Sequence, residues 1–332
     1  MSSITCQYTS AEPGALDSVS LETNLPLRRR LYPLGFPLDL ETNSRDIIEA
    51  ASEGWGHFSQ IFEEAPVRVS LAVVEGDATT QQAGSHFFWR EHLMTIFDGP
   101  LNVMVCDFRQ GFACGSVTRA VAMDHSLVRY RFLTASANTL IEQRALAPLH
   151  GALIVRNGSG VMLCGESFAG KSTLAYACSR AGWIYVSDDA TLLVRGAQDR
   201  CAIGDPHSIR FREDARRFFP ELADRLTVVR PNGKLAIEVF TRELPITVAS
   251  QCSIDNVVLL ARQNSGAARL TRYPKAQVLE DWKKYAVLGT EDVRAAQLDC
   301  HRRLLEAGTW ELEYSSLDGA IARLDQLVDS GA

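Results

Sequence analysis

One octapeptide, residues 165–172, constrains this 332-residue chain more than any other stretch. Gly165, Gly170, Lys171 and Ser172 occupy all four fixed positions of the pattern G-x-x-x-x-G-K-[S/T], which is typical of phosphate-binding loops. The apolar run 161–164 predicts a strand that enters the loop, and residues 172–180 predict a helix that leaves it. This strand–loop–helix context favours a phosphate site over a chance match of an ordinary turn.

The chemistry of such a loop depends on these residue types. Glycines let the backbone turn tightly, so that successive N–H groups converge on phosphate oxygens, and the helix adds its positive N-terminal end. We expect Lys171 to reach the outer phosphates of a nucleotide and the Ser172 hydroxyl to bind Mg²⁺. The predicted nucleotide-binding residues are Gly165, Glu166, Ser167, Phe168, Ala169, Gly170, Lys171, Ser172 and Thr173.

An acidic pair follows the next predicted strand, residues 183–187. A compact strand–helix–strand unit crosses over right-handed and places its two strands parallel, with their carboxyl ends side by side. Asp188 and Asp189 are therefore expected near the phosphates, one facing Mg²⁺ and the other an acceptor hydroxyl. A solvated Asp-Asp turn is the alternative.

Asn157-Gly158 predicts a tight hairpin that pairs strand 149–156 with strand 161–164. His150 would then lie on the strand beside the phosphate loop, either as a structural histidine or as part of the site. The remaining elements expected in this half are strand 191–194, helix 213–222, hairpin 228–239, strand 256–261, helix 291–306, strand 310–314 and helix 317–328.

The first half has a different pattern. Residues 1 to about 40 are rich in Ser, Pro and Thr and predict irregular chain. A helix over 43–62 is expected next, and then short β-prone runs that predict a mostly antiparallel sheet: 67–74, 101–107, 112–117 and 127–132. A helix over 136–146 closes this half. We therefore predict an α/β (α+β) protein with a β-rich N-terminal region, residues 1–145, and a phosphate-loop domain, residues 146–332.

Composition narrows the class of protein further. The net charge is −6 and no basic stripe occurs, which argues against a nucleic-acid surface. No apolar run approaches the length of a membrane span, and the N-terminus lacks the features of a signal peptide, so a cytoplasmic protein without a membrane partner is expected. The eight cysteines include no C-x-x-C pair and predict buried free thiols. Cys164 could alternatively be sensitive to oxidation.

Three linked features in this order resemble the catalytic domain of HPr kinase/phosphorylase and the wider group of HPr-kinase-like serine kinases. They are His150-Gly151, the GESFAGKS loop, and Ser187-Asp188-Asp189, with Asp189 18 residues after Lys171. That fold also resembles the nucleotide-binding core of phosphoenolpyruvate carboxykinase. The resemblance is strong from about 149 to 189 and fainter to the end of the chain.

The resemblance implies an ATP- and Mg²⁺-dependent kinase that phosphorylates a hydroxyl, here a serine of a protein or peptide. Ser172 and Asp188 would lie on the metal side, with Asp188 supporting either the metal or the base. Asp189 would be the base, and His150 would organise the site. Arg230 or Lys234, in a stretch similar to the family's V-R-P segment, would reach the transferred phosphate. The implied catalytic residues are thus Asp189, Asp188, Lys171, His150 and Arg230.

The sequence also departs from the family. Phe168 stands where a second loop glycine is frequent, and Ser208 stands where a Mg²⁺-binding glutamate precedes the Ile-Arg pair. Glu213 or Asp214 could replace that glutamate. The first 145 residues look more like the β-rich leader of the HPr-kinase-like proteins than like the N-terminal domain of HPr kinase, so HPr as substrate, reverse phosphorolysis and a hexamer are not implied.

Two other functions stay open at this point: an ATP-binding regulatory module without turnover, and a kinase that acts on a small metabolite. The sequence does not decide between ATP and GTP, name the acceptor or give the oligomeric state.

Overall fold

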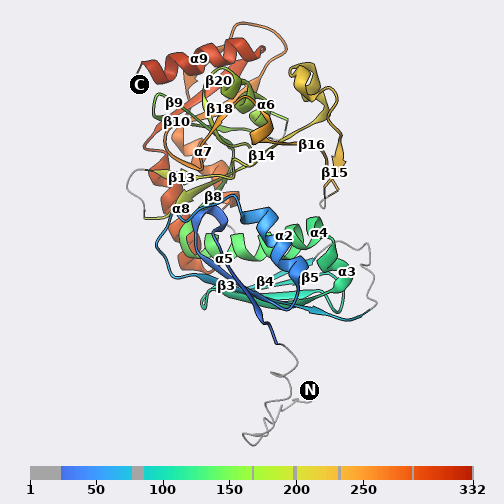
Figure 1. Cartoon of the computed structure of the whole chain (residues 1–332). Coiled ribbons are helices and arrows are strands. Elements are labelled where there is room, and N and C mark those ends of the chain that lie inside the picture. Colours follow the sequence, from blue (N-terminus) through green and yellow to red (C-terminus); the bar gives the residue numbers. More distant parts are fainter. Residues whose placement is uncertain are drawn as a thin grey trace, which may run out of the picture.

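The computed structural model describes residues 24–76, 86–166, 168–196, 200–230, 233–285 and 288–330. Within these ranges the chain is a mixed α/β protein with a seven-stranded, a ten-stranded and a three-stranded sheet (Figure 1). The seven-stranded sheet and its helices form the lower part of the view, and the larger sheet forms the upper part. The predicted α/β class is confirmed. Among the described residues, no helix combines the length and apolar character needed to cross a membrane.

The N-terminal sheet is mixed rather than mostly antiparallel. Its central pairs, β2–β3 and β3–β7, are parallel, and the other four pairs are antiparallel. Residues 27–42, predicted to be irregular, contribute two of its strands. In sheet order the strands are β1 (Leu27–Leu31), β2 (Leu38–Thr42), β3 (Val67–Val74), β7 (Phe112–Thr118), β6 (Val103–Asp107), β5 (Leu93–Phe97) and β4 (His86–Arg90).

Helices cover the face of this sheet that looks toward the upper part of the molecule (Figure 1). They are α2 (Arg45–Trp55), α3 (Arg119–Met123), α4 (His125–Val128) and α5 (Ala135–Ala145), with π-helical residues Arg129–Thr134 leading into α5. Two predictions fail here. The helix expected over 43–62 ends at Trp55, and the strand expected over 127–132 is helical, because Asp124 caps the N–H of Leu127 and buried residues recur at helical spacing.

The larger sheet carries the loop of residues 165–172, which the sequence predicts to bind phosphate. Helices α6 (Lys171–Arg180) and α9 (Leu317–Asp329) pack on one face, and α7 (Lys275–Trp282) and α8 (Glu291–Leu304) pack on the other. The long central strand β18 (Gln251–Arg262) pairs parallel with β10 (Ser159–Cys164) and with β20 (Gly308–Tyr314), which in turn pairs with β19 (Arg269–Arg272). The other strands are β17 (Thr247–Val248), β11 (Ile184–Ser187), β9 (Ala152–Arg156), β13 (Cys201–Ile203), β12 (Ala190–Val194) and β8 (Leu146–His150).

The hairpin at Asn157-Gly158 forms as predicted and joins β9 to β10. The predicted strand 149–156, however, is broken at Gly151. His150 ends β8, which pairs with β12 and not with the strand that enters the loop. The backbone crosses so tightly at Gly151 that a Cβ atom there would lie 2.8 Å from the carbonyl oxygen of Leu163.

The two strands that carry the loop and the acidic pair are parallel but not adjacent. Strand β9 lies between β10 and β11 and is antiparallel to both. The expected side-by-side placement is therefore wrong. Both strands nonetheless end at the same edge of the sheet, because each is antiparallel to β9 and they therefore run in the same direction.

The three-stranded sheet lies beside the large one, in the order β14 (Ser208–Phe211), β16 (Leu235–Phe240) and β15 (Val228–Val229). The last two strands form the predicted hairpin, whose turn residue Asn232 lies outside the described ranges. The helix expected over 213–222 is instead two 3₁₀ turns, Glu213–Arg217 and Pro220–Leu222, because Pro220 has no N–H to continue a helix.

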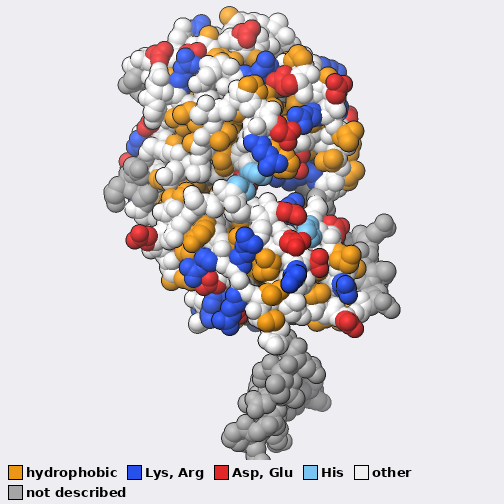
Figure 2. All heavy atoms as spheres, in the orientation of Figure 1, with side chains coloured by type: hydrophobic (Ala, Val, Ile, Leu, Met, Phe, Trp, Pro, Cys, Tyr) orange, Lys and Arg blue, Asp and Glu red, His pale blue; other side chains and the backbone are white. Residues whose placement is uncertain are grey.

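The surface carries charges of both signs, and the prediction of buried thiols holds for some of the cysteines. Positive and negative side chains are interspersed over the face shown in Figure 2, and histidines lie at the constriction between the upper and lower parts. Cys106, Cys164, Cys178 and Cys300 are buried free thiols, Cys114 is an exposed one, and Cys6 lies outside the described ranges. Burial raises the pKa of Cys164 to about 12, so this thiol stays protonated at neutral pH.

Candidate nucleotide site

The loop between β10 and α6 has the backbone geometry of an anion cradle. Gly165, Phe168 and Gly170 have φ values of 152°, 75° and 93°, and α6 begins directly after Gly170. The Ala169 N–H donates to the Glu166 carbonyl oxygen over 3.1 Å and closes the turn. Left-handed residues that alternate with ordinary ones turn backbone N–H groups toward one point. Ser167, one of the predicted binding residues, lies outside the described ranges.

Two side chains from distant segments support the loop, and neither was foreseen from the sequence. The Tyr314 hydroxyl donates to the Ala169 carbonyl oxygen at 2.8 Å, and a Cβ atom at position 170 would lie 2.6 Å from that hydroxyl. Glycine is thus needed at position 170 for space as well as for its φ value. The exposed Phe168 ring lies under the Arg212 guanidinium, 3.6 Å from its carbon, and this contact accompanies the left-handed backbone at Phe168.

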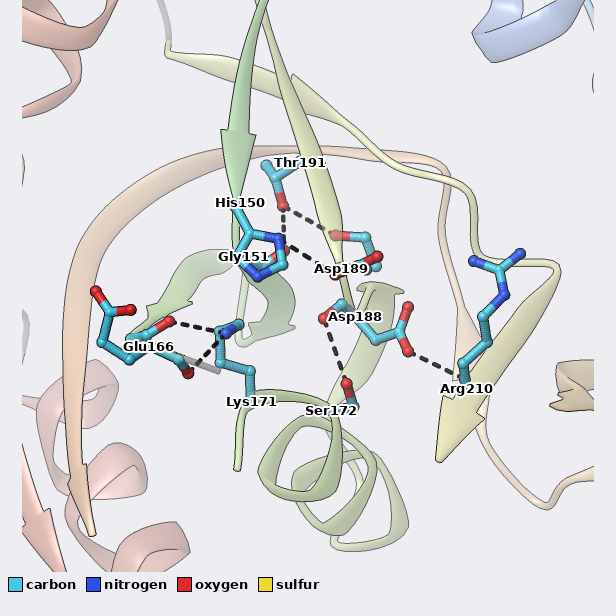
Figure 3. Close-up of polar contacts among 11 residues, drawn as sticks. His150, Gly151, Glu166, Lys171, Ser172, Asp188, Asp189, Thr191 and Arg210 are labelled. Carbon is cyan, nitrogen blue, oxygen red and sulfur yellow. Dashed lines mark hydrogen bonds and ion pairs between the residues drawn. The ribbon is translucent and has the colours of Figure 1, made fainter. Parts of the chain in front are cut away.

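The side chain of Lys171 contacts the backbone of its own loop. Its Nζ donates to the carbonyl oxygens of Gly165 and Glu166, at 2.8 and 3.2 Å (Figure 3). Burial lowers the pKa of Lys171, and nearby negative charge, including that of Asp189, opposes this shift. Neutral carbonyl oxygens are weaker partners for an ammonium group than phosphate oxygens. Thr173, also a predicted binding residue, follows half-buried in the first turn of α6.

The acidic pair meets this loop at Ser172. The Ser172 hydroxyl lies 3.5 Å from the backbone oxygen of Asp188 and donates to it (Figure 3). The carboxylate of Asp188 points away from the lysine and accepts the Arg210 N–H at 3.1 Å. Burial raises the pKa of Asp188 to about 6, and Arg210 opposes that shift. Asp188 is therefore a buried hydrogen-bond acceptor whose negative charge destabilises the folded protein. The alternative interpretation, a solvated Asp-Asp turn, does not hold for Asp188.

Asp189 faces His150. Its Oδ1 lies 3.2 Å from His150 Nδ1, and both side chains are partly exposed. Burial and then the charge of Lys171 lower the pKa of His150, while Asp189 opposes the shift. The imidazole is therefore neutral at neutral pH, and the tautomer with a proton on Nδ1 is the one that can donate to the carboxylate.

Backbone and hydroxyl contacts tie these two segments together. Gly151 N–H donates to the Asp189 carbonyl oxygen at 3.1 Å, and Thr191 Oγ1 donates to the Gly151 carbonyl oxygen at 3.1 Å (Figure 3). Ser187 Oγ lies 2.9 Å from the same threonine hydroxyl. The structure thus brings His150-Gly151 and Ser187-Asp188-Asp189 together. The strand that ends at His150 does so by pairing with β12, and not with strand 161–164 as predicted.

Other predicted residues lie elsewhere. The described hydrogen bonds of Arg230 are backbone contacts within its own hairpin, to Gly233 and Lys234. The Glu213 carboxylate accepts from Arg216 and Thr227 beside the 3₁₀ turns, so its contacts do not support a role as the missing metal-side glutamate.

Oxygen donors of the right kind for Mg²⁺ lie at the junction of loop and acidic pair. Mg²⁺ usually binds one or two carboxylates together with waters and substrate phosphates. The Ser172 hydroxyl and the two aspartates fit that description. A preformed cluster of three or more His, Cys, Asp or Glu side chains does not occur among the described residues.

Comparisons with known proteins add little to this geometry. No protein-family model matches the chain, and no curated protein matches it. Among solved structures, the chain is similar to the HPr(Ser) kinase/phosphatase from Coxiella burnetii, with 13% identity and a TM-score of 0.28 over 55% of this chain and 98% of that one. A TM-score of this size does not establish a shared fold, so what the site can do follows from its own residues.

Proposed function

We propose that this chain is an ATP-dependent kinase that transfers the γ-phosphate to a hydroxyl, a serine of a protein or peptide. The observation that carries the proposal is the contact of Ser172 with the Asp188 backbone, which joins a phosphate-binding loop to a pair of aspartates. Phosphoryl transfer needs mainly positioning and charge stabilisation from a protein, and this junction supplies both kinds of group.

In this proposal the loop from Gly165 to Thr173 binds the triphosphate. Lys171 exchanges its two carbonyl partners for phosphate oxygens, which are stronger acceptors. Ser172 and Asp188 would hold Mg²⁺, which would supply positive charge that offsets part of the negative charge of the phosphates. The Asp188 carboxylate accepts a hydrogen bond from the Arg210 N–H, so metal binding must either break this hydrogen bond or use the carboxylate alongside it.

Asp189 is the proposed base. Its partly exposed carboxylate can accept the proton of an incoming serine hydroxyl while the serine oxygen bonds to the γ-phosphorus, the bond from that phosphorus to the β–γ bridging oxygen breaks, and ADP leaves. Neutral His150 holds the carboxylate in place from the other side. Arg230 is the last residue of the proposed catalytic set and contacts the transferred phosphate. This contact requires the hairpin that carries Arg230 to move toward the loop.

We also propose that this catalytic unit is a domain of residues 146–332, with residues 1–145 as a separate β-rich domain.

The test uses purified protein, Mg·ATP and serine-containing peptides, with intact-mass detection of the phosphorylated product. Asp189→Asn is expected to abolish transfer and to leave ATP affinity, measured by calorimetry, within about twofold of wild type. Asp299→Asn, on the exposed surface of α8, is the matched control and should retain activity. Transfer that persists in Asp189→Asn would show that another group is the base.

A regulatory module that binds ATP without turnover is the second candidate. The observation that favours it is the engagement of Asp188 with the Arg210 backbone, which competes with metal binding. This candidate predicts ATP binding by calorimetry but no ADP production with any acceptor.

A further inference from the structure

A second lysine lies beside the phosphate loop, from a segment far away in the sequence. Lys284 belongs to the 3₁₀ turn Lys283–Tyr285, which follows α7. Its Nζ lies 3.6 Å from the Glu166 carboxylate, in the loop itself, and its side chain is 53% exposed. The Glu166 side chain is 90% exposed, so this ion pair is in solvent. An exposed ion pair of this length contributes little to stability and can be broken at little cost.

Lys284 also lies within electrostatic reach of the catalytic side of the site. Burial and Lys171 are the larger causes of the lowered pKa of His150, and the positive charge of Lys284 adds to them. The turn that carries Lys284 contacts the loop through Glu166, and it also packs beside β8, the strand that ends at His150.

The other cations around the loop are more firmly held. Arg212 stacks on the Phe168 ring at 3.6 Å, and Arg210 Nε donates to the Glu238 carboxylate at 3.0 Å. The described contacts of Lys284 are instead a long ion pair with Glu166 and contacts to the adjacent Tyr285, whose ring centre lies 5.3 Å away and whose hydroxyl it also approaches. It is the cation that a newly bound anion would most easily recruit.

We propose that Lys284 leaves Glu166 and binds a phosphate oxygen of the nucleotide, as a second phosphate-binding lysine outside the loop motif. The inference rests on the proposed nucleotide site and names a further binding residue for it. A triphosphate carries several negative charges where Glu166 carries one, so at similar exposure it is the stronger partner for the ammonium group. Glu166 would thereby act as a placeholder that keeps the lysine turned toward the loop.

The test measures ATP binding by calorimetry, in the presence of Mg²⁺, for the wild-type 332-residue chain and five variants, one of which is Lys171→Ala. Lys284→Gln is expected to weaken binding about tenfold, more strongly at low salt. Lys283→Gln removes the same charge from the neighbouring residue, which pairs with Glu280 of α7, and should change the affinity less than about twofold. Glu166→Gln should tighten binding by a few-fold, and this gain should vanish in the double variant Glu166→Gln/Lys284→Gln.

The outcomes separate this inference from the proposed function. If Lys171→Ala loses ATP binding while Lys284→Gln and Lys283→Gln bind equally well, the nucleotide site stands and the role of Lys284 is wrong. A Glu166→Gln variant with weaker binding also overturns it. If Lys284→Gln keeps its ATP affinity but shifts the pH dependence of transfer, the lysine acts on His150 instead of on the nucleotide. Wild-type protein that binds no ATP would overturn the proposed function, and this inference with it.

Discussion

Replacing Asp188 by asparagine should make the ligand-free protein more stable while it disables the proposed metal site. Asp188 is 5% exposed, and burial raises the pKa of its carboxyl group from 3.8 to about 6. A pKa raised in the folded state means that the folded protein retains a proton that the unfolded chain has lost, so stability falls as pH rises from about 4 to about 6. Above that pH window Asp188 is charged, and its buried charge lowers the free energy of unfolding.

The magnitude follows from the shift. A difference of roughly two pKa units corresponds to about 3 kcal/mol in the free energy of unfolding, reached near pH 7, and to roughly half of that near pH 5. Asparagine has no charge, and its amide oxygen can still accept the Arg210 N–H. We therefore expect Asp188→Asn to gain up to about 3 kcal/mol near pH 7 and clearly less near pH 5.

Denaturant unfolding of wild type and Asp188→Asn at both pH values, without nucleotide or metal, measures this gain. Asp189→Asn is the matched control, because its carboxylate is partly exposed and its removal should change stability little. An Asp188→Asn variant that is less stable than wild type near pH 7, or whose advantage is the same at both pH values, would refute the assignment of a buried, energetically costly charge. The same variant should show no Mg²⁺-dependent transfer.

Three further predictions concern the loop and α8. Tyr314→Phe removes the hydrogen bond to Ala169 and should raise the KM for ATP by a few-fold with a loss of about 1 kcal/mol in unfolding free energy, whereas unchanged steady-state kinetics would show that the hydroxyl does not support the loop. Gly170→Ala places a Cβ atom against the Tyr314 hydroxyl at a left-handed backbone position, so calorimetry should detect no ATP binding; normal affinity would contradict the described loop geometry. His301 is fully buried and burial lowers its pKa to about 4, so it makes stability rise with pH from about 4 to about 6.5, and His301→Gln should remove that rise in denaturant titrations. A His301→Gln variant with the wild-type pH dependence would show that the imidazole does not titrate in that window.

The loop of residues 165–172 and its immediate flanks were predictable in structure because their signals are local. The four fixed loop residues, the apolar strand before them and the helix after them all lie within about 20 residues and form as expected. The Asn157-Gly158 hairpin depends on the same kind of short-range chemistry. Asp188 and Asp189 also lie at the predicted edge of the sheet, since helix α6 carries the chain back between β10 and β11 and the two strands therefore run in the same direction.

Strand adjacency and distant partners were not predictable in this way. Nothing in residues 149–156 indicates that β9 inserts between β10 and β11, because pairing depends on which sheet edge is free when the strand docks. The break at Gly151 results from a close approach to Leu163 that only the folded chain creates. Three residues beside the loop or the acidic pair come from segments whose local sequence contains no phosphate-binding motif: Arg210, Tyr314 and Lys284.

The strand wrongly predicted over 127–132 illustrates the same limit within the first half. Its residues are β-prone, but Val128 and Phe132 lie four positions apart and both are buried against the N-terminal core. Packing against that core, together with the Asp124 cap, outweighs the local preference.

The most direct test of the central claim is a search for a phosphorylated product in cells that express wild-type protein or Lys171→Ala, by quantitative phosphoproteomics. The proposed kinase predicts at least one phosphoserine that is abundant with wild type and absent with Lys171→Ala, because that lysine leaves the Gly165 and Glu166 carbonyl oxygens to bind the triphosphate. Identical phosphoserine profiles in the two strains, at equal protein levels, would contradict it.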